Sequence, residues 1–231
     1  MFYFYVVHHK VNPNNFVDGH VLDTALRSFV GMQPIPICYG LTIGEYALML
    51  NGENWINEQK KCKLSVIEME NYCPDEYYSL FVCPSPNLKT DTAIMNYPTL
   101  CLFEGTKVSV GRGTNEPFQV IGYPRYSDTT LSFAPISIKG VSEEPPYKDS
   151  VCYGKRVVIQ DNKIHLQYLI DMYNSYPEKE KFFSSFFDKL CGTTQLKEDI
   201  KERKSEQDIR KQWEEKIKEY LKIRNKYLIY N

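Results

Sequence analysis

The spacing of proline, glycine and apolar residues divides this 231-residue chain into two parts near residue 161. Before that point, short apolar runs are interrupted by proline and glycine, which end helices and mark turns. After it, apolar residues recur at steps of three and four, the spacing of helices with one buried face. The pattern predicts a mixed α/β (α+β) fold. We expect a mixed sheet with flanking helices and the candidate cleft motifs in residues 1–160, and a helical C-terminal region, residues 161–231, packed on the same domain.

Strands in the first part are marked by β-branched and aromatic residues, or by prolines that forbid a helix. We expect extended segments at residues 2–7, 34–40, 63–70, 108–111, 118–124, 131–140 and 155–160. Thr42 lies three residues before Glu45, which is the spacing of a capping box and predicts the start of a helix. A second helix is expected to begin at Asp91 and to break near Pro98.

Three helices are expected in the second part. Residues 163–176 place Leu166 and Leu169 on one face, and residues 181–192 form a short helix that ends at Gly192. Residues 205–230 are expected to form one long helix with a single buried stripe.

Composition argues against several classes of function. The formal net charge of −1 provides no attraction to nucleic acid or to anionic lipid. The seven cysteines contain no C-x-x-C pair, so we expect neither a zinc site nor a redox motif, and no metal or cofactor. The opening apolar run at residues 2–7 is too short to span a membrane, and it lacks the basic residues that precede the apolar core of a signal peptide.

Five motifs, in order along almost the whole chain, resemble the exo-β-N-acetylmuramidase family, long known only as a domain of unknown function. They are FVGMQPIPICYGLTIGEYALMLNGE, PSPNL, YPTLCLFEGTKVSVGRGTNEPFQVIGYP, FFDKLCGTTQLKEDI and SEQDIRKQWEEKIKEYLKIRNKYLIY. The resemblance implies a glycoside hydrolase of cell-wall recycling. It would release terminal N-acetylmuramic acid from the non-reducing end of peptidoglycan fragments, in a cleft between two domains.

Two departures from the family pattern affect this interpretation. Family members have a Rossmann-like domain ahead of the matching part, and we expect this chain to be the C-terminal portion without it. A motif that resembles LDRPNP in the family reads HHKVNP at His8–Pro13, so that His9 and Lys10 replace the aspartate and the arginine. As the resemblance implies, part of the acid–base machinery, including a key glutamate, lies on the Rossmann-like domain.

The chain would then be a truncated or split gene product, or it would work with a separately encoded Rossmann-like domain. The alternative is a non-catalytic module that binds muramyl sugars or a partner domain. The resemblance implies the cell envelope or periplasm as location, although the chain itself shows no signal peptide.

Glu104 is the first candidate for the catalytic residue. It follows Leu102 and Phe103, and no charged residue precedes it until Asp91. Glycoside hydrolysis generally uses two carboxyl groups, and apolar neighbours raise the pKa of the one that protonates the leaving oxygen. The alternative is a structural acid that accepts hydrogen bonds from the amides of the following glycine turns.

Arg112, between Gly111 and Gly113, is the first candidate for substrate binding. Muramic acid carries a lactyl carboxylate, which a guanidinium group can grip with two parallel hydrogen bonds. The two glycines would let backbone and ligand approach closely. The alternative is an internal salt bridge, in which Glu104 itself would be the partner.

Two further residues are candidates for substrate binding. Asn87 lies in the proline-stiffened loop PSPNL, where its amide can bond a hydroxyl or acetamido group, or else stabilise its own loop. Asp18, in the sequence VDG, is a candidate carboxylate of the cleft, and the alternative is a turn residue.

Overall fold

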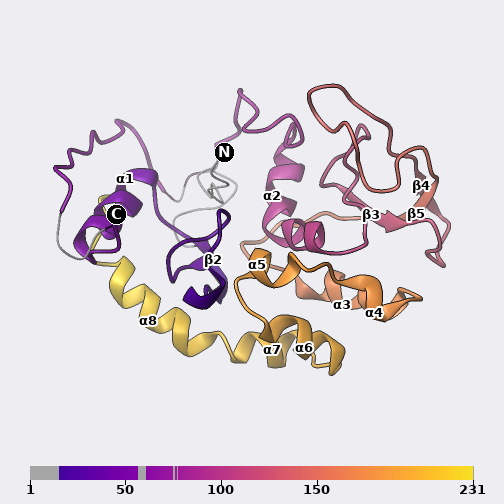
Figure 1. Ribbon diagram of the computed structural model, residues 1–231. Helices are drawn as coiled ribbons and strands as arrows, with labels where there is room; N and C mark the ends of the chain where they lie inside the picture. Colours follow the sequence, from indigo (N-terminus) through magenta and orange to yellow (C-terminus); the bar gives the residue numbers. More distant parts are fainter. Residues whose placement is uncertain (1–15, 57–60, 75, 77, 231) are drawn as a thin grey trace.

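The computed structural model describes residues 16–56, 61–74, 76 and 78–230 of the chain (Figure 1). The strand expected at residues 2–7 and the motif at His8–Pro13 lie outside the described residues. The described elements form two groups, and each group has a buried core of its own.

The smaller group brings together the beginning and the end of the described chain (Figure 1). Its elements are β1 (Val17–Val21), the 3-10 helix η1 (Thr24–Leu26), β2 (Pro36–Tyr39), α1 (Ile43–Gly52) and α8 (Glu214–Arg224). The two strands pair antiparallel, and α8 is fixed to the end of β2. The Tyr220 hydroxyl donates to the Tyr39 carbonyl at 2.6 Å. The Arg224 Nε donates to the Gly40 carbonyl at 2.7 Å.

The larger group contains the main core and an antiparallel sheet in the order β3-β5-β4. Its elements are α2 (Asp91–Leu100), the 3-10 helix η2 (Cys101–Gly105), β3 (Val120–Tyr123), β4 (Leu131–Phe133), β5 (Cys152–Arg156), α3 (Leu166–Ser175), α4 (Lys179–Phe182), α5 (Phe187–Cys191), α6 (Gln195–Lys201) and α7 (Glu206–Lys211). Phe103, Phe118, Phe182 and Phe187 are almost completely buried in this core. In Figure 1 the sheet lies on the opposite side of the molecule from α1 and the C-terminus.

The mixed α/β class is confirmed, with two small antiparallel sheets among the described residues. The capping box is also present: the Glu45 amide donates to the Thr42 hydroxyl at 3.2 Å, and the Thr42 amide donates to the Glu45 carboxylate at 2.6 Å. Extended chain at residues 34–40 contains β2, and the expected strands at 118–124 and 131–140 contain β3 and β4. Helix α2 begins at Asp91 as expected and continues past Pro98 to Leu100.

The strand expected at residues 63–70 is wrong. This segment has no regular secondary structure and is mostly exposed, and the Ile67 side chain is 94% exposed. A strand is stabilised by a partner strand and a buried face, and the described residues provide neither for this segment. The strand expected at 155–160 is shifted, because β5 covers Cys152–Arg156 and only its last two residues fall in that range.

The helical part has more breaks than its apolar spacing predicts. The helix expected at 181–192 is two helices, α4 and α5, because the chain between them pairs in extended form with the loop after η2. The Lys107 amide donates to the Phe182 carbonyl at 2.9 Å, and the Ser184 amide donates to the Gly105 carbonyl at 2.9 Å. The long helix expected at 205–230 is interrupted between α7 and α8 at Trp213, whose side chain is buried in the main core.

Candidate functional site

The candidate catalytic residue Glu104 and the candidate substrate-binding residue Arg112 form an ion pair at the surface of the larger group. Glu104 lies in η2, and Arg112 lies in the turn that follows. The guanidinium Nε and Nη2 contact the same carboxylate oxygen, Oε1, at 2.8 and 2.6 Å, and the guanidinium also lies over the Phe118 ring at 4.9 Å. The side chains are 21% exposed for Arg112 and 26% for Glu104, so the pair is accessible to solvent.

The two glycines beside Arg112 adopt left-handed backbone conformations, with φ of +74° at Gly111 and +80° at Gly113. A Cβ atom on Gly111 would lie 2.7 Å from the Glu116 carbonyl oxygen, and one on Gly113 would lie 2.5 Å from the Ile136 carbonyl oxygen. The close approach that glycine allows is therefore made by the protein's own backbone. An approach of ligand to these glycines stays a prediction.

Asn87 is almost fully buried in its loop. Its side-chain amide donates to the Val141 carbonyl at 3.3 Å, and its backbone amide donates to the Ser85 hydroxyl at 3.3 Å. These bonds agree with the alternative in which Asn87 stabilises local structure. Substrate binding by Asn87 stays a prediction.

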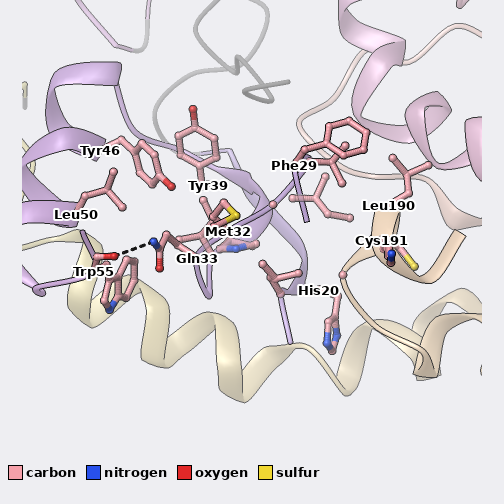
Figure 2. Close-up of a pocket in the computed structure, with 18 of the residues that line it drawn as sticks. His20, Phe29, Met32, Gln33, Tyr39, Tyr46, Leu50, Trp55, Leu190 and Cys191 are labelled. Carbon is pink, nitrogen blue, oxygen red and sulfur yellow. Dashed lines mark hydrogen bonds between the residues drawn. The ribbon is translucent and has the colours of Figure 1, made fainter. Parts of the chain in front are cut away.

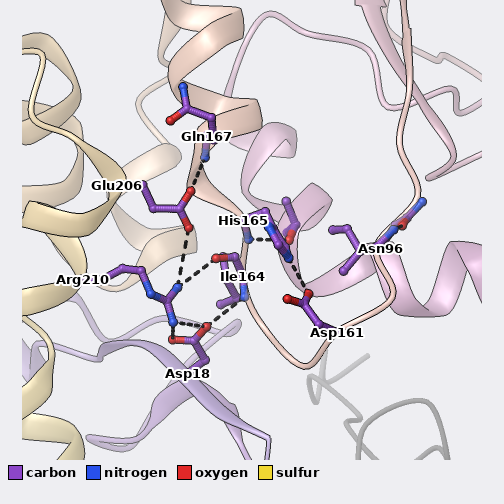
Figure 3. A network of polar contacts seen from close by, with 10 residues as sticks. Asp18, Asn96, Asp161, Ile164, His165, Gln167, Glu206 and Arg210 are labelled. Carbon is purple, nitrogen blue, oxygen red and sulfur yellow. Dashed lines mark hydrogen bonds and ion pairs between the residues drawn. The ribbon is translucent and has the colours of Figure 1, made fainter.

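Asp18 lies at the centre of a polar network that connects three distant segments (Figure 3). Both carboxylate oxygens accept from Nη2 of Arg210 at 2.8 Å. Oδ2 also accepts from the Ile164 amide at 2.8 Å, and Oδ1 accepts from the Gly19 amide at 2.8 Å. The Asp18 side chain is 5% exposed. This geometry favours a structural role, and substrate binding by Asp18 stays a prediction.

The same network extends to α7 and α3. Nη1 of Arg210 donates to the Ile164 carbonyl at 2.9 Å and lies 3.8 Å from the Glu206 carboxylate, which in turn accepts from the Gln167 amide at 2.9 Å (Figure 3). The sequence does not indicate that Arg210 contacts Asp18, because only the fold brings Arg210 to β1. The network ties the start of the described chain to the helical part.

The smaller group contains a cavity of about 360 Å³ that none of the predicted site residues lines (Figure 2). Figure 2 shows Tyr39, Tyr46 and Trp55 gathered on one side of it and Leu190 and Cys191 on the other. Half of the remaining lining residues come from the chain between β1 and β2. That segment belongs to the first of the motifs on which the family resemblance rests.

The polar groups that line the cavity are few. Gln33 Nε2 donates to the Trp55 carbonyl at 3.1 Å, which fixes the side-chain amide. Burial, together with the nearby charge of Lys216, lowers the pKa of His20 to about 4, so its imidazole is neutral at pH 7. Burial raises the pKa of the Cys191 thiol to about 12, so it stays protonated. Lys189 is the charged residue of the lining.

Metal-ligand clusters and membrane-spanning helices are both absent from residues 16–56, 61–74, 76 and 78–230. There, no group of three or more histidine, cysteine, aspartate or glutamate residues is arranged to hold a metal ion. No helix in that part of the chain has the length and apolar character needed to cross a bilayer.

Family models and one curated protein match nearly the whole chain. The model for the N-terminal part of the exo-beta-N-acetylmuramidase NamZ matches residues 3–92, and the model for its C-terminal part matches residues 95–230. The peptidoglycan beta-N-acetylmuramidase NamZ of Bacillus subtilis (strain 168) is 32% identical over 249 residues, which cover 98% of this chain and 59% of that protein. The sequence alone suggested only the C-terminal portion of the family, whereas residues 3–92 match the N-terminal model.

Two crystal structures of DUF1343 family proteins from Bacteroides fragilis NCTC 9343 share the fold. One is 40% identical with a TM-score of 0.90, and the other is 23% identical with a TM-score of 0.79. Each comparison covers 95% of this chain and 64% of the solved chain. The chain therefore spans about three fifths of the length of these relatives. The family models divide it between residues 92 and 95, and the boundary expected at residue 160 stays a prediction.

Proposed function

This chain belongs to the exo-β-N-acetylmuramidase NamZ family, and from that premise we propose that it is part of an enzyme that releases terminal N-acetylmuramic acid from peptidoglycan fragments. The observation that carries the proposal is the 32% identity, over 98% of this chain, to a peptidoglycan beta-N-acetylmuramidase. Because the chain spans 59% of that protein, we propose that turnover also needs residues outside these 231. A Rossmann-like domain, in the same or a separate polypeptide, would supply them.

Glu104 is the proposed catalytic carboxylate of this part. Its Oε1 is held by Arg112, whereas its Oε2 has no hydrogen-bond partner among the described residues. One carboxylate oxygen is therefore fixed, and the other is free to act as base or nucleophile, because an ion pair with arginine favours the charged form of a carboxyl group. The second carboxyl group that glycoside hydrolysis needs would come from the rest of the enzyme.

Arg112 is proposed to position Glu104 and to contact the sugar beside it. Glu104 occupies Nε and Nη2 of the guanidinium, and Nη1 has no hydrogen-bond partner in the part of the chain that the structure describes. Glu104 uses two of the five guanidinium N–H groups, one on Nε and one on Nη2, so Nη1 and the second N–H of Nη2 can still donate to the substrate. Gly111 and Gly113 support this contact through the turn that holds Arg112 in place.

The proposal is tested by measuring the release of a chromogenic leaving group from its β-glycoside of N-acetylmuramic acid. We expect little or no release by this chain alone, and release when the upstream portion of a family member is supplied as a second polypeptide. In that assembly Glu104→Gln should abolish release, while the surface variant Glu144→Gln should not. Full activity of Glu104→Gln would remove Glu104 from the mechanism.

A non-catalytic role is the second candidate, because the match covers 59% of the curated muramidase. A module that binds muramyl sugars or a partner domain would bind N-acetylmuramic acid without releasing a leaving group, even in the presence of the upstream portion. The same assay, run beside a binding measurement, separates the two roles.

A further inference from the structure

The cavity of the smaller group has the dimensions and walls of a small-ligand site. Its volume of about 360 Å³ falls within the range of known ligand pockets, roughly 300 to 1,000 Å³. The aromatic residues Tyr39, Tyr46 and Trp55 form one side (Figure 2), and Trp55 is partly exposed, whereas the rings of Tyr39 and Tyr46 are buried against each other. The fixed amide of Gln33 provides a polar group beside them.

The charge of the lining points to the kind of ligand. Among the described residues that line the cavity, Lys189 alone is charged at pH 7, because His20 is neutral. Lys189 is exposed and has no ion-pair partner in the described ranges, although the neighbouring Asp188 pairs with Lys197 at 2.5 Å. A ligand that complements this cavity has an uncharged body and one anionic group.

We propose that the cavity binds the N-acetylmuramic acid unit of the substrate and that Lys189 binds its lactyl carboxylate. This inference rests on the proposed function. Muramic acid has an uncharged ring with hydroxyl and acetamido groups and a single carboxylate, which matches the walls and the lone cation. Arg112 is the weaker partner for that carboxylate, because its positive charge is already paired with Glu104.

Helix α5 connects the cavity with the predicted acid. Its first residue, Phe187, packs against Gly105, so closely that a Cβ atom there would lie 2.8 Å from the Phe187 Cα. Its last residues, Leu190 and Cys191, line the cavity. A helix of five residues is about 7.5 Å long. Lys189 therefore belongs to the short helix that packs on Gly105, the neighbour of Glu104, at one end and lines the cavity at the other.

The test is to titrate the full chain with N-acetylmuramic acid and with N-acetylglucosamine, which lacks the lactyl group, by calorimetry. We expect Lys189→Met to weaken binding of N-acetylmuramic acid about tenfold and to leave N-acetylglucosamine unchanged. Lys189→Arg should restore most of the loss. The control Lys201→Met removes an equal charge from the exposed face of α6 and should change neither affinity. Trp55→Ala should weaken both sugars.

The outcomes separate this inference from the function on which it rests. Equal affinities of Lys189→Met and the unchanged chain for N-acetylmuramic acid would overturn the inference and leave the glycosidase assay unaffected. Selective loss in Arg112→Ala instead would show that the carboxylate binds there and that the inference is wrong. Absence of binding of either sugar, together with absence of release in the supplemented assay, would overturn both.

Discussion

Two acid–arginine pairs in this molecule have the same chemistry and different surroundings. Glu104 and Arg112 are eight residues apart and lie at the surface, with side chains 26% and 21% exposed. Asp18 and Arg210 are 192 residues apart, and the Asp18 side chain is 5% exposed. The first pair is a local feature that leaves polar atoms free. The second closes the fold and uses both carboxylate oxygens.

The difference indicates which pair serves stability and which is available for function. Partly exposed ion pairs contribute little to stability because water and salt screen them. Removal of one partner of a buried pair is costly because the other charge then stays in the interior without compensation. We therefore assign Asp18–Arg210 to the fold and keep Glu104–Arg112 as the candidate for chemistry.

Asp18→Asn should have the largest effect on stability of the variants that test this comparison. It removes the negative charge that faces Arg210, and we expect the free energy of unfolding to fall by about 3 kcal/mol, the lower end for buried pairs because Arg210 is 29% exposed. Urea unfolding followed by circular dichroism measures the change. Asp128→Asn, in an exposed loop, is the matched control and should unfold like the unchanged chain. Equal midpoints for the two variants would contradict the assignment.

His20 tests whether a buried titratable group that has no ion pair in the described structure also affects stability. Burial lowers its pKa from 6.5 to about 4. Between these pH values the unfolded chain binds a proton that the folded chain does not, so stability is complete above pH 6.5 and falls as the pH drops towards 4. After allowance for partial exposure, we expect His20 to contribute a loss of about 2 kcal/mol over this range.

His20→Gln should remove that part of the pH dependence, as measured by urea unfolding at pH 4.5 and 7. Lys216→Met should reduce it, because the charge of Lys216 is the second cause of the lowered pKa. If His20→Gln had the same slope with pH as the unchanged chain, the loss would have to come from other groups.

Features that depend on residues close together in the sequence could be predicted for much of the fold. The capping box at Thr42 and Glu45 fixes a helix start through contacts three residues apart, and the sequence shows both partners. The segment 63–70 was predicted wrongly, because β-branched residues favour a strand only where a partner strand exists, and pairing depends on the whole fold. The break in the C-terminal helix at Trp213 was also not predicted. The Trp213 side chain is buried in the main core, and the spacing of apolar residues along the helix does not reveal that contact.

In the candidate site, too, contacts between residues close in sequence could be predicted, and contacts between distant residues could not. Glu104 and Arg112 lie in one short stretch of sequence, so an ion pair between them was one of the two hypotheses for Arg112, and the structure contains it. No pattern indicated Arg210 as the partner of Asp18. The cavity could not be predicted either, because it is formed by the packing of β1, β2 and α1 against the end of α5.

Glu104→Gln should have the smallest effect on stability and is therefore the sharpest test of the division of roles. The pair is partly exposed, and glutamine can still accept a hydrogen bond from Arg112, so we expect the free energy of unfolding to change by less than about 1 kcal/mol. The change should shrink further in 1 M salt, whereas that of Asp18→Asn should persist. A loss as large as that of Asp18→Asn would show that Glu104 holds the fold together. A small loss combined with abolished sugar release in the completed enzyme would show a carboxylate kept for chemistry, because residues of functional sites are selected for activity and not for stability.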